Sequence, residues 1–315
     1  MSAVPPDDSA LPTRQARKTP WLRWAGTLLA LGLLIYLLIN VGWEALAQAL
    51  ERLSWGAFLL AFALTLLSRL STVGRWHTLL RSADVSITLL QSTRLVFAGL
   101  FAANFLPTTV GGDLVRFVGA LRLGLDGAVC AASLVMDRLV GMAGMATVLP
   151  IGLARFFSQP FPQTLPAIGA GAVVLPGWAK WVKGKLLSLW QSLKTALRLW
   201  ASRPKDLLRA YLFTWGHMLA TFASVWLLLN QMGEGISFWL IAGLWSMAYF
   251  ITLLPVSING LGVQEVALTF FFVTYGGVST ENALLIALLM RVLPALASLP
   301  GSLFIGTLLQ PEKPS

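Results

Sequence analysis

Long apolar runs alternate with short polar segments along the chain. Seven runs approach or exceed the roughly 20 residues that a helix needs to cross a bilayer. They cover residues 22–41, 54–73, 128–150, 165–179, 207–229, 236–254 and 282–309. The fourth run is the weakest, since it is short and contains Pro166 and Pro176. The pattern predicts an all-α integral membrane protein, a polytopic helix bundle of about 7–8 spans.

The composition agrees with this prediction, since 57% of the 315 residues are hydrophobic and 11% are charged. Such a chain lies far outside soluble-protein averages. The net charge of +10 does not indicate nucleic-acid binding, because the basic residues lie between apolar runs and no soluble region is left to read a groove. The single Cys130 lies inside an apolar run, so no intrachain disulfide can form. We expect no nucleic-acid partner and a packing role for Cys130.

Basic residues favour some connections over others, as the positive-inside rule expects. The 42–53 loop has two acidic residues and only Arg52, whereas the 74–94 and 180–209 connections are basic. The tail before the first span is basic as well. We therefore expect the N-terminus and both basic connections in the cytoplasm.

The domain organisation follows from the same runs. We expect a disordered cytoplasmic tail over residues 1–20, one transmembrane domain over 21–310 and a short tail over 311–315. The first span could be mistaken for a signal peptide, because Ala45-Leu46-Ala47 resembles a cleavage site. Its length is nearer to that of a span, so we expect an uncleaved anchor.

An amphipathic helix is predicted at about residues 181–201, within the second basic connection. Its apolar positions recur at steps of three and four, and they are Val182, Leu186, Leu189, Trp190, Leu193, Leu197 and Trp200. Lysines and arginines lie between them, which is typical of a helix on an anionic inner leaflet. Such a helix could gather lipid headgroups or could be an ordinary interfacial connector.

Two apolar segments are interrupted in a similar way. Leu95 to Leu106 ends at Pro107 and runs into Gly111, Gly112 and Asp113, and Leu254 is followed by Pro255 and the polar turn up to Glu265. Downstream, Gly124 precedes Arg138 by the same fourteen residues as Gly277 precedes Arg291. Paired interruptions of this kind indicate an internal repeat with a midplane binding site. The sequence leaves open whether the repeat is parallel or inverted, and whether 264–276 spans or re-enters.

The interruptions predict a cavity, because hydrocarbon cannot satisfy the backbone groups that a broken helix exposes. A half-helix starting after Gly112 would direct free N–H groups and a positive dipole end towards an anionic group such as a lipid phosphate. Asp113 could instead cap that helix. Asn104 and Asn259 flank the two interruptions and could bind headgroup oxygens or the freed backbone.

Ionisable residues lie at membrane depth, where each costs roughly 2.5–3.5 kcal/mol at a helix centre. Asp137 and Arg138 are adjacent within one run and need not pair, since neighbours on a helix point about 100° apart. We expect partners among the broken segments, and these are Asp113, Arg116, Glu265 and Arg291. A purely structural ion network would look the same in sequence.

Three other residues are weaker candidates. Arg69 can snorkel from a helix end, and His77 lies in a basic connection. His217 lies inside a span, where a hydrogen bond within the bundle is favoured over a proton relay.

Several motifs together resemble a known family. "NFLPTTVGGDLVRF" at 104–117, "MDRLVG" at 136–141, "PVSINGLGVQE" at 255–265 and the late Arg291 are similar, in order and spacing, to the lysylphosphatidylglycerol synthase transmembrane-region family, also called flippase-like domain proteins. The resemblance implies an inner-membrane bundle related to the flippase part of the bacterial multiple peptide resistance factor, which moves aminoacylated phosphatidylglycerol between leaflets. It also implies a set of substrate-binding positions: Asn104, Pro107, Gly111, Gly112, Asp113, Arg116, Asp137, Arg138, Asn259, Gly260, Gly262, Glu265 and Arg291.

The expected function is therefore lipid translocation, with a phospholipid or other envelope lipid as partner and no cofactor or metal. The synthase domain of that factor has no counterpart here, so we expect no lipid aminoacylation. The sequence contains no Walker-type phosphate loop, which argues against ATP hydrolysis. Two alternatives remain at this point: an intramembrane enzyme acting on lipid headgroups with Asp113, Asp137 or Glu265 as acid or base, and a non-transporting scaffold for envelope-lipid biosynthesis.

Overall fold

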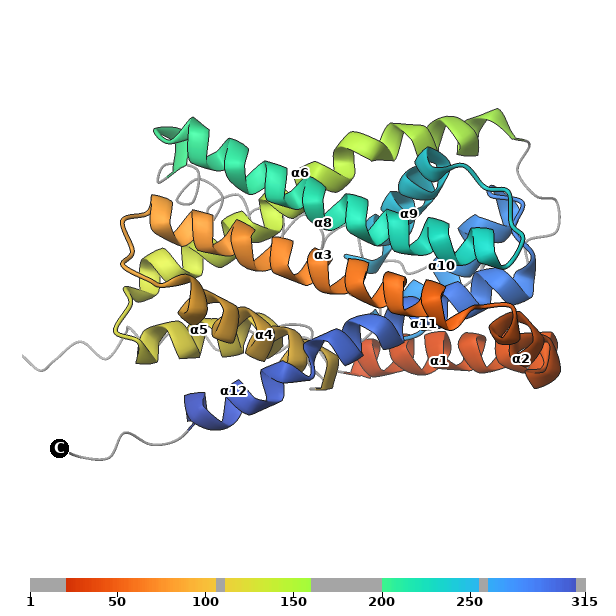
Figure 1. The fold of residues 1–315 in the computed structure, drawn as a ribbon, viewed down its shortest axis with the longest axis horizontal. Helices are drawn as coiled ribbons and strands as arrows, with labels where there is room; N and C mark the ends of the chain where they lie inside the picture. Colours follow the sequence, from red (N-terminus) through yellow and green to blue (C-terminus); the bar gives the residue numbers. More distant parts are fainter. Residues whose placement is uncertain (1–20, 106–110, 160–199, 255–259, 310–315) are drawn as a thin grey trace, which may run out of the picture.

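The chain folds into helices throughout the part that the computed structural model describes, which is residues 21–105, 111–159, 200–254 and 260–309 (Figure 1). In chain order the helices are α1 (Trp21–Val41), α2 (Trp43–Glu51), α3 (Trp55–Ser82), α4 (Leu89–Phe105), α5 (Gly111–Arg122), α6 (Gly127–Ser158), α8 (Pro204–Gln231), α9 (Phe238–Thr252), α10 (Val263–Thr274), α11 (Thr280–Ser298) and α12 (Pro300–Leu309).

Four of these helices, α3, α6, α8 and α11, are long and apolar enough to cross a membrane. The end of α1 and the whole of α2 together form a fifth candidate, bent by 77° at Gly42, whose φ of 80° suits glycine. The chain is therefore a multi-pass helical membrane protein, as predicted. The expected 42–53 loop is wrong, since most of it is helix α2.

Several expected boundaries also change. The 54–73 and 128–150 spans continue to Ser82 and Ser158, so the predicted 74–94 connection shrinks to a short segment between α3 and α4. The 282–309 run is divided between α11 and α12. The 165–179 run lies outside the described residues.

Most of the predicted amphipathic helix lies outside them too. Its end is described, and there the Trp200 indole is fully buried rather than facing lipid. The Trp200 Nε1 donates to Ser82 Oγ at 2.7 Å and to the Leu79 carbonyl at 3.2 Å. This end of the segment therefore packs on the end of α3.

The two interrupted segments form re-entrant hairpins. The helices α4, α5, α9 and α10 have 17, 12, 15 and 12 residues, so each is about 18–25 Å long, short of the ~30 Å hydrocarbon core. In the first hairpin α5 returns along α4, because a Cβ added at Gly112 would lie 2.6 Å from the Gly99 carbonyl oxygen and 2.9 Å from Ala103 Cβ. In the second, Gly260 approaches Thr252 and Gly276 approaches Leu244. The run 236–254 is thus one arm of a hairpin and is shorter than the span expected there.

The helices repeat in order and spacing. Helices α3 and α8 both have 28 residues, and α8 begins 149 residues after α3, just as α9 begins 149 residues after α4. The short helix and the long helix that follow also correspond, α5 with α10 and α6 with α11. Gly124 and Gly277, in the turns before the long helices, have φ values of 74° and 70°. One four-helix unit therefore occurs twice.

The two units are inverted relative to each other. Helices α3 and α8 pack antiparallel, because Arg75 contacts Thr214 while Ser224, later in α8, contacts Ala61, earlier in α3. Near the centre of this seam Ser68 Oγ lies 2.6 Å from His217 Nδ1, and these residues are 149 positions apart. Equivalent positions that meet on antiparallel helices lie on a pseudo-two-fold axis perpendicular to the helices. The seam thus indicates an inverted repeat, an arrangement typical of transporters (Figure 1).

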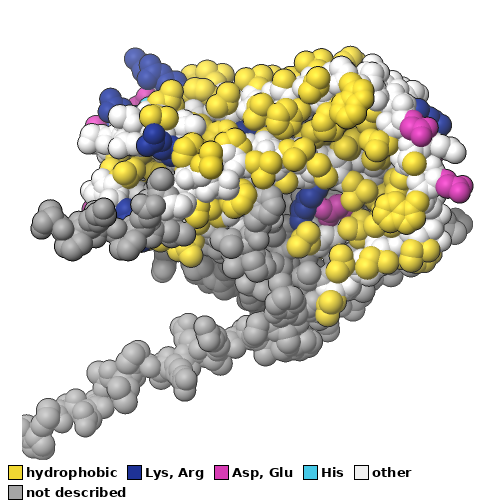
Figure 2. Space-filling model, turned by 60° about the horizontal axis from the view of Figure 1, so that its bottom comes forward, with side chains coloured by type: hydrophobic (Ala, Val, Ile, Leu, Met, Phe, Trp, Pro, Cys, Tyr) yellow, Lys and Arg dark blue, Asp and Glu magenta, His cyan; other side chains and the backbone are white. Residues whose placement is uncertain are grey.

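Charge is distributed unequally between the two ends of the bundle. The end of α3 and the start of α8 meet in the Asp84–Arg203 ion pair at 2.5 Å, and the hydrogen bond from Arg203 holds the pKa of Asp84 below its usual range. On the face that Figure 2 shows, several Lys and Arg side chains gather at this end, the basic end, and carboxylates lie at the opposite, acidic end. The first hairpin enters from the basic end and the second from the acidic end, because α4 follows α3 and α9 follows α8.

Candidate functional site

A carboxylate on α6 binds two guanidinium groups. Asp137 Oδ1 accepts a hydrogen bond from Arg75 Nε at 2.6 Å, and Oδ2 accepts from Arg116 Nη1 and Nη2 at 3.1 and 3.2 Å. The Arg116 guanidinium also lies over the Trp76 ring, 4.2 Å from its centroid. All three charged side chains are nearly shielded from solvent, with exposed fractions of 4% for Asp137, 11% for Arg75 and 9% for Arg116. The cluster fastens α3 and α5 to α6.

Arg138 points to a different partner from its neighbour Asp137. Its Nε and Nη2 donate to Asp113 Oδ2 at 2.7 and 2.5 Å, and Asp113 Oδ1 also accepts from Arg116 at 3.4 Å. The Arg138 side chain is 57% exposed. The expected partners of Asp137 and Arg138 in the first broken segment are therefore right, while Arg75 was missed because it was assigned to a connection.

A second ion pair joins α10 to α11. Arg291 Nε lies 3.3 Å from Glu265 Oε1, and Arg291 Nη1 donates to Gln264 Oε1 at 3.3 Å. The Glu265 side chain is 3% exposed, and its Oε2 has no hydrogen-bond partner among the described residues. The second broken segment therefore pairs within itself and does not join the Asp137 cluster.

The ion pairs Asp113–Arg138 and Glu265–Arg291 occupy equivalent positions in the two repeats. Asp113 and Glu265 are each the third residue of the short helix after the break, and Arg138 and Arg291 are each the twelfth residue of the next long helix. Their surroundings differ, since the Arg138 side chain is more than half exposed and the Arg291 side chain is 26% exposed at a cavity.

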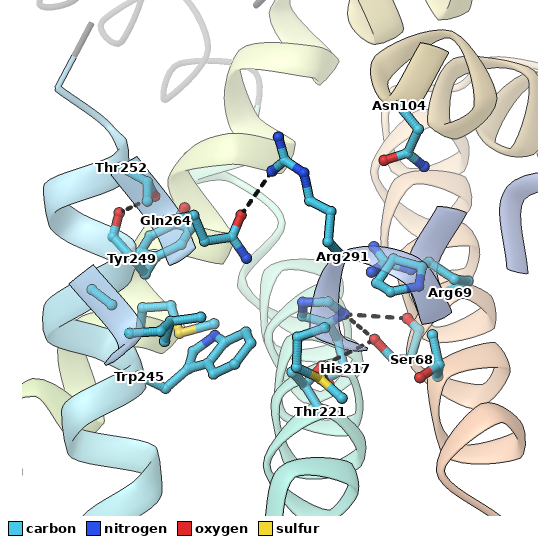
Figure 3. A pocket seen from close by; sticks show the side chains of 16 residues that line it. Ser68, Arg69, Asn104, His217, Thr221, Trp245, Tyr249, Thr252, Gln264 and Arg291 are labelled. Atoms are coloured by element: carbon cyan, nitrogen blue, oxygen red, sulfur yellow. Dashed lines mark hydrogen bonds between the residues drawn. The ribbon is translucent and has the colours of Figure 1, made fainter. Parts of the chain in front are cut away.

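This cavity has a volume of about 270 Å³ and lies beside the centre of the interface between α3 and α8, where Ser68 meets His217. Figure 3 shows its polar side chains, which come from both repeats and include Ser68, Arg69, Asn104, His217, Gln264 and Arg291. The lining also includes apolar and aromatic side chains, among them Met145, Trp245, Leu268 and Met290. The cavity therefore offers cationic and hydrogen-bonding groups together with apolar surface.

Both hairpins reach the cavity with the residues next to their tips. Asn104 comes from the end of α4, Thr252 from the end of α9 and Gln264 from the start of α10. Asn104 Nδ2 donates to Ser298 Oγ at 3.0 Å, which ties the first hairpin to α11. The tips themselves, with Pro107 and Asn259, lie outside the described residues.

A smaller pocket of about 80 Å³ lies where α4 and α5 touch, and Gly99, Gly112, Asp113 and Arg116 line it. The start of α5, expected to face the main cavity, lines this pocket instead. The Asp113 carboxylate is engaged by Arg116 and Arg138. Of the remaining expected positions, Gly111 is buried at the start of α5, and Gly260 and Gly262 take positive φ values of 67° and 77° before α10.

Sequence reasoning missed several cavity residues. Arg69 was expected to snorkel, yet it lines the cavity, and its Nε is buried with no hydrogen-bond partner in the described part of the chain. His217 does make the expected hydrogen bond within the bundle, to Ser68. A signal was present, because Thr65, Ser68, Arg69 and Thr72 follow one another at helical steps inside an apolar run.

Comparison with known protein families identifies the chain's family. The family model described as the lysylphosphatidylglycerol synthase TM region matches residues 23–301, which include both repeats and the cavity. No curated protein matches the chain.

Proposed function

Because this chain belongs to the lysylphosphatidylglycerol synthase TM region family, we propose that it is a lipid translocase that moves a charged-headgroup lipid between the leaflets of the bacterial inner membrane. The observation behind the proposal is the cavity at the centre of the bundle, which is lined by residues next to the tips of both re-entrant hairpins. A translocase must shelter the headgroup at this depth, since polar groups are costly in hydrocarbon.

The size and lining of the cavity suit a headgroup. A volume of about 270 Å³ is at the lower end for small-molecule sites, too small for two acyl chains. Arg291, Asn104 and Gln264 offer hydrogen bonds, while Trp245 and Leu268 provide an apolar wall. The headgroup is bound inside, and the acyl chains remain in the bilayer.

The inverted repeat supports movement in both directions across the midplane. In transporters of this architecture, sites lie at the interface between repeats and discontinuous helices from each repeat converge on them. Here one hairpin comes from each end of the bundle, and both contribute to the cavity wall.

The charge distribution supports an orientation. Under the positive-inside rule the basic end, with Arg203, faces the cytoplasm. Helix α1 then starts on the cytoplasmic side, since α3 starts at the acidic end and α1 precedes it across the bundle.

The predicted binding residues divide into two roles in this proposal. Asn104 and Arg291 contact the headgroup, because they line the cavity. Asp113, Arg116 and Asp137 hold the first hairpin against α3 and α6 through ion pairs, and Arg138 belongs to the same cluster.

The test uses the purified chain in proteoliposomes with a headgroup-preserving, tail-labelled fluorescent phosphatidylglycerol, whose outer-leaflet fraction is read by chemical quenching. Thr252→Phe places a ring at the cavity wall and is expected to lower the translocation rate at least tenfold. Thr280→Phe, at an exposed position at the start of α11, is the matched control and should leave the rate unchanged.

Translocation by the wild type no faster than in protein-free liposomes, or equal rates for Thr252→Phe and wild type, would contradict the proposal. A chemically altered lipid recovered from the same vesicles would favour the enzyme alternative. Neither movement nor product would favour the scaffold. Thermal unfolding of each variant in detergent separates loss of function from loss of fold.

A further inference from the structure

Arg69 has a different environment from the other arginines of the membrane interior. Arg75 and Arg116 share Asp137, and Arg291 pairs with Glu265. Arg69 makes no ion pair or hydrogen bond within the described residues, and its Nε is buried. The residue as a whole is only partly buried, but a cation at membrane depth without a counter-ion is still unfavourable, so a partner from outside the chain would stabilise it.

The cavity provides the space for such a partner. Arg69 lines the cavity with Arg291 and His217, and Figure 3 shows the three side chains around the same region. The described lining contains no Asp or Glu. Since Glu265 balances Arg291, the cavity has one uncompensated positive charge, that of Arg69.

The repeat shows that helix packing does not require this arginine. The position equivalent to Arg69 on α8, 149 residues later, is Met218. Met218 is fully buried and packs against Met145, Val148, Phe222 and Ala242. One repeat therefore places an unbranched apolar side chain where the other places a cation that faces the cavity.

We propose that Arg69 is the principal ligand-binding residue of the cavity and that it takes a monoanionic phosphate ester. The inference rests on the proposed function and names the chemistry of its substrate. A guanidinium binds phosphate oxygens through two parallel hydrogen bonds, and one phosphodiester neutralises one charge. Asn104 and Gln264, which also line the cavity, have further hydrogen-bonding groups for the rest of a headgroup.

Calorimetric titration of the purified full chain in detergent tests this. The probes are dihexanoyl phosphatidylglycerol, dihexanoylglycerol with the same tails and no phosphate, and soluble glycerophosphoglycerol, which has the same monoanionic phosphodiester and no tails. The wild type should bind the anionic lipid at least tenfold more tightly than dihexanoylglycerol. Arg69→Met, which copies the residue of the other repeat, should lose at least tenfold in affinity for the anionic lipid.

Two further variants keep the test decisive. Arg209→Met removes an exposed cation at the start of α8 and should bind like the wild type. Arg69→Lys keeps the charge without the planar fork and should bind with an affinity between those of the wild type and Arg69→Met. If Arg69→Met does not fold, the comparison of Arg69→Lys with wild type replaces it, and equal affinities there would contradict the proposal.

The outcomes are separable. Equal affinity of Arg69→Met and wild type for the anionic lipid, or equal affinity of the wild type for charged and uncharged lipid, overturns the assignment. Arg69-dependent binding of glycerophosphoglycerol as tight as that of the lipid supports the anion site and identifies a soluble ester as its source. Arg69-dependent lipid binding without translocation in proteoliposomes contradicts the proposed function and leaves this inference standing.

Discussion

Asp137→Asn should destabilise the fold more than any other single charge removal in the Asp137 cluster. The asparagine keeps the size of the side chain and removes the charge that Arg75 and Arg116 share, at distances of 2.6 and 3.1–3.2 Å. Both guanidinium groups are about nine-tenths shielded from solvent. Removing one partner of a buried pair costs about 3–5 kcal/mol because the remaining charge is uncompensated. Arg116 keeps only one ion pair, its 3.4 Å contact with Asp113, besides its place over the Trp76 ring, so we expect the loss to lie in this range.

The assay is equilibrium unfolding in mixed micelles with increasing sodium dodecyl sulfate, followed by tryptophan fluorescence. Asp206→Asn is the matched control, because its ion pair with Arg209 joins residues three apart at the start of α8 and the arginine is 69% exposed. Exposed pairs of this kind contribute about 0.3–0.5 kcal/mol. If Asp137→Asn lost no more free energy of unfolding than Asp206→Asn, the cluster would not hold α3, α5 and α6 together.

Three other results are expected. Gly112→Ala should prevent close packing of α5 on α4, because the new Cβ would lie 2.6 Å from the backbone oxygen of Gly99. Gly32→Ala is the control, since its Cβ would meet open space. Thermal unfolding should show a lower midpoint for Gly112→Ala than for Gly32→Ala. Glu234 should make the protein less stable in acid. Burial raises the pKa of Glu234, but hydrogen bonds from Ser279 and Asn282 outweigh burial and hold the pKa below 4.5. The contribution of Glu234 to the free energy of unfolding is therefore complete above pH 4.5 and is lost as the pH falls through the pKa of the folded state. Between about pH 5 and pH 3, Glu234→Gln should lose less free energy of unfolding than the wild type. Equal losses would show that Glu234 is not the source of the acid sensitivity. In a Cys130→Ala background, cysteines at Asp84 and Lys205 should react with a membrane-impermeant maleimide from one side of the membrane and a cysteine at Glu51 from the other. Labelling of Lys205 from the side of Glu51, opposite to Asp84, would refute the inverted arrangement.

The class of fold and the location of the breaks could be predicted from sequence, because hydrocarbon imposes local requirements. A long apolar run in hydrocarbon satisfies its backbone groups as a helix, and the Leu-Pro pairs followed by glycine-rich polar turns indicate where the runs break. The length of each helix was harder to predict, since α3 continues nine residues beyond the predicted span with Arg75 inside it. The predicted span ended before Arg75, because Arg75 was assigned to a basic connection, whereas Asp137 allows Arg75 to remain buried in the bundle.

The cavity could not be predicted in detail because its wall comes from distant parts of the chain. Asn104 and Arg291 were predicted from the breaks, whereas Trp245 lies in a regular helix with no local mark. Arg69 belongs to a polar stripe on α3, but the stripe alone does not show which residues it faces. The relation of the repeats was also undetermined in sequence, because a parallel and an inverted pair share the same spacing. The contact between Ser68 and His217 decides it, and that contact exists only in the folded chain.

Because both four-helix units belong to one chain, their sequences can differ at the interface where they meet. In a symmetric homodimer of a single unit, the arginine at position 69 would also occupy the place of Met218, buried beside Phe222 and Met145 with no counter-ion. Likewise two serines or two histidines would face each other where Ser68 now meets His217. Joining both copies in one polypeptide removes that constraint, so the molecule can have a symmetric scaffold and a binding site with a single positive charge.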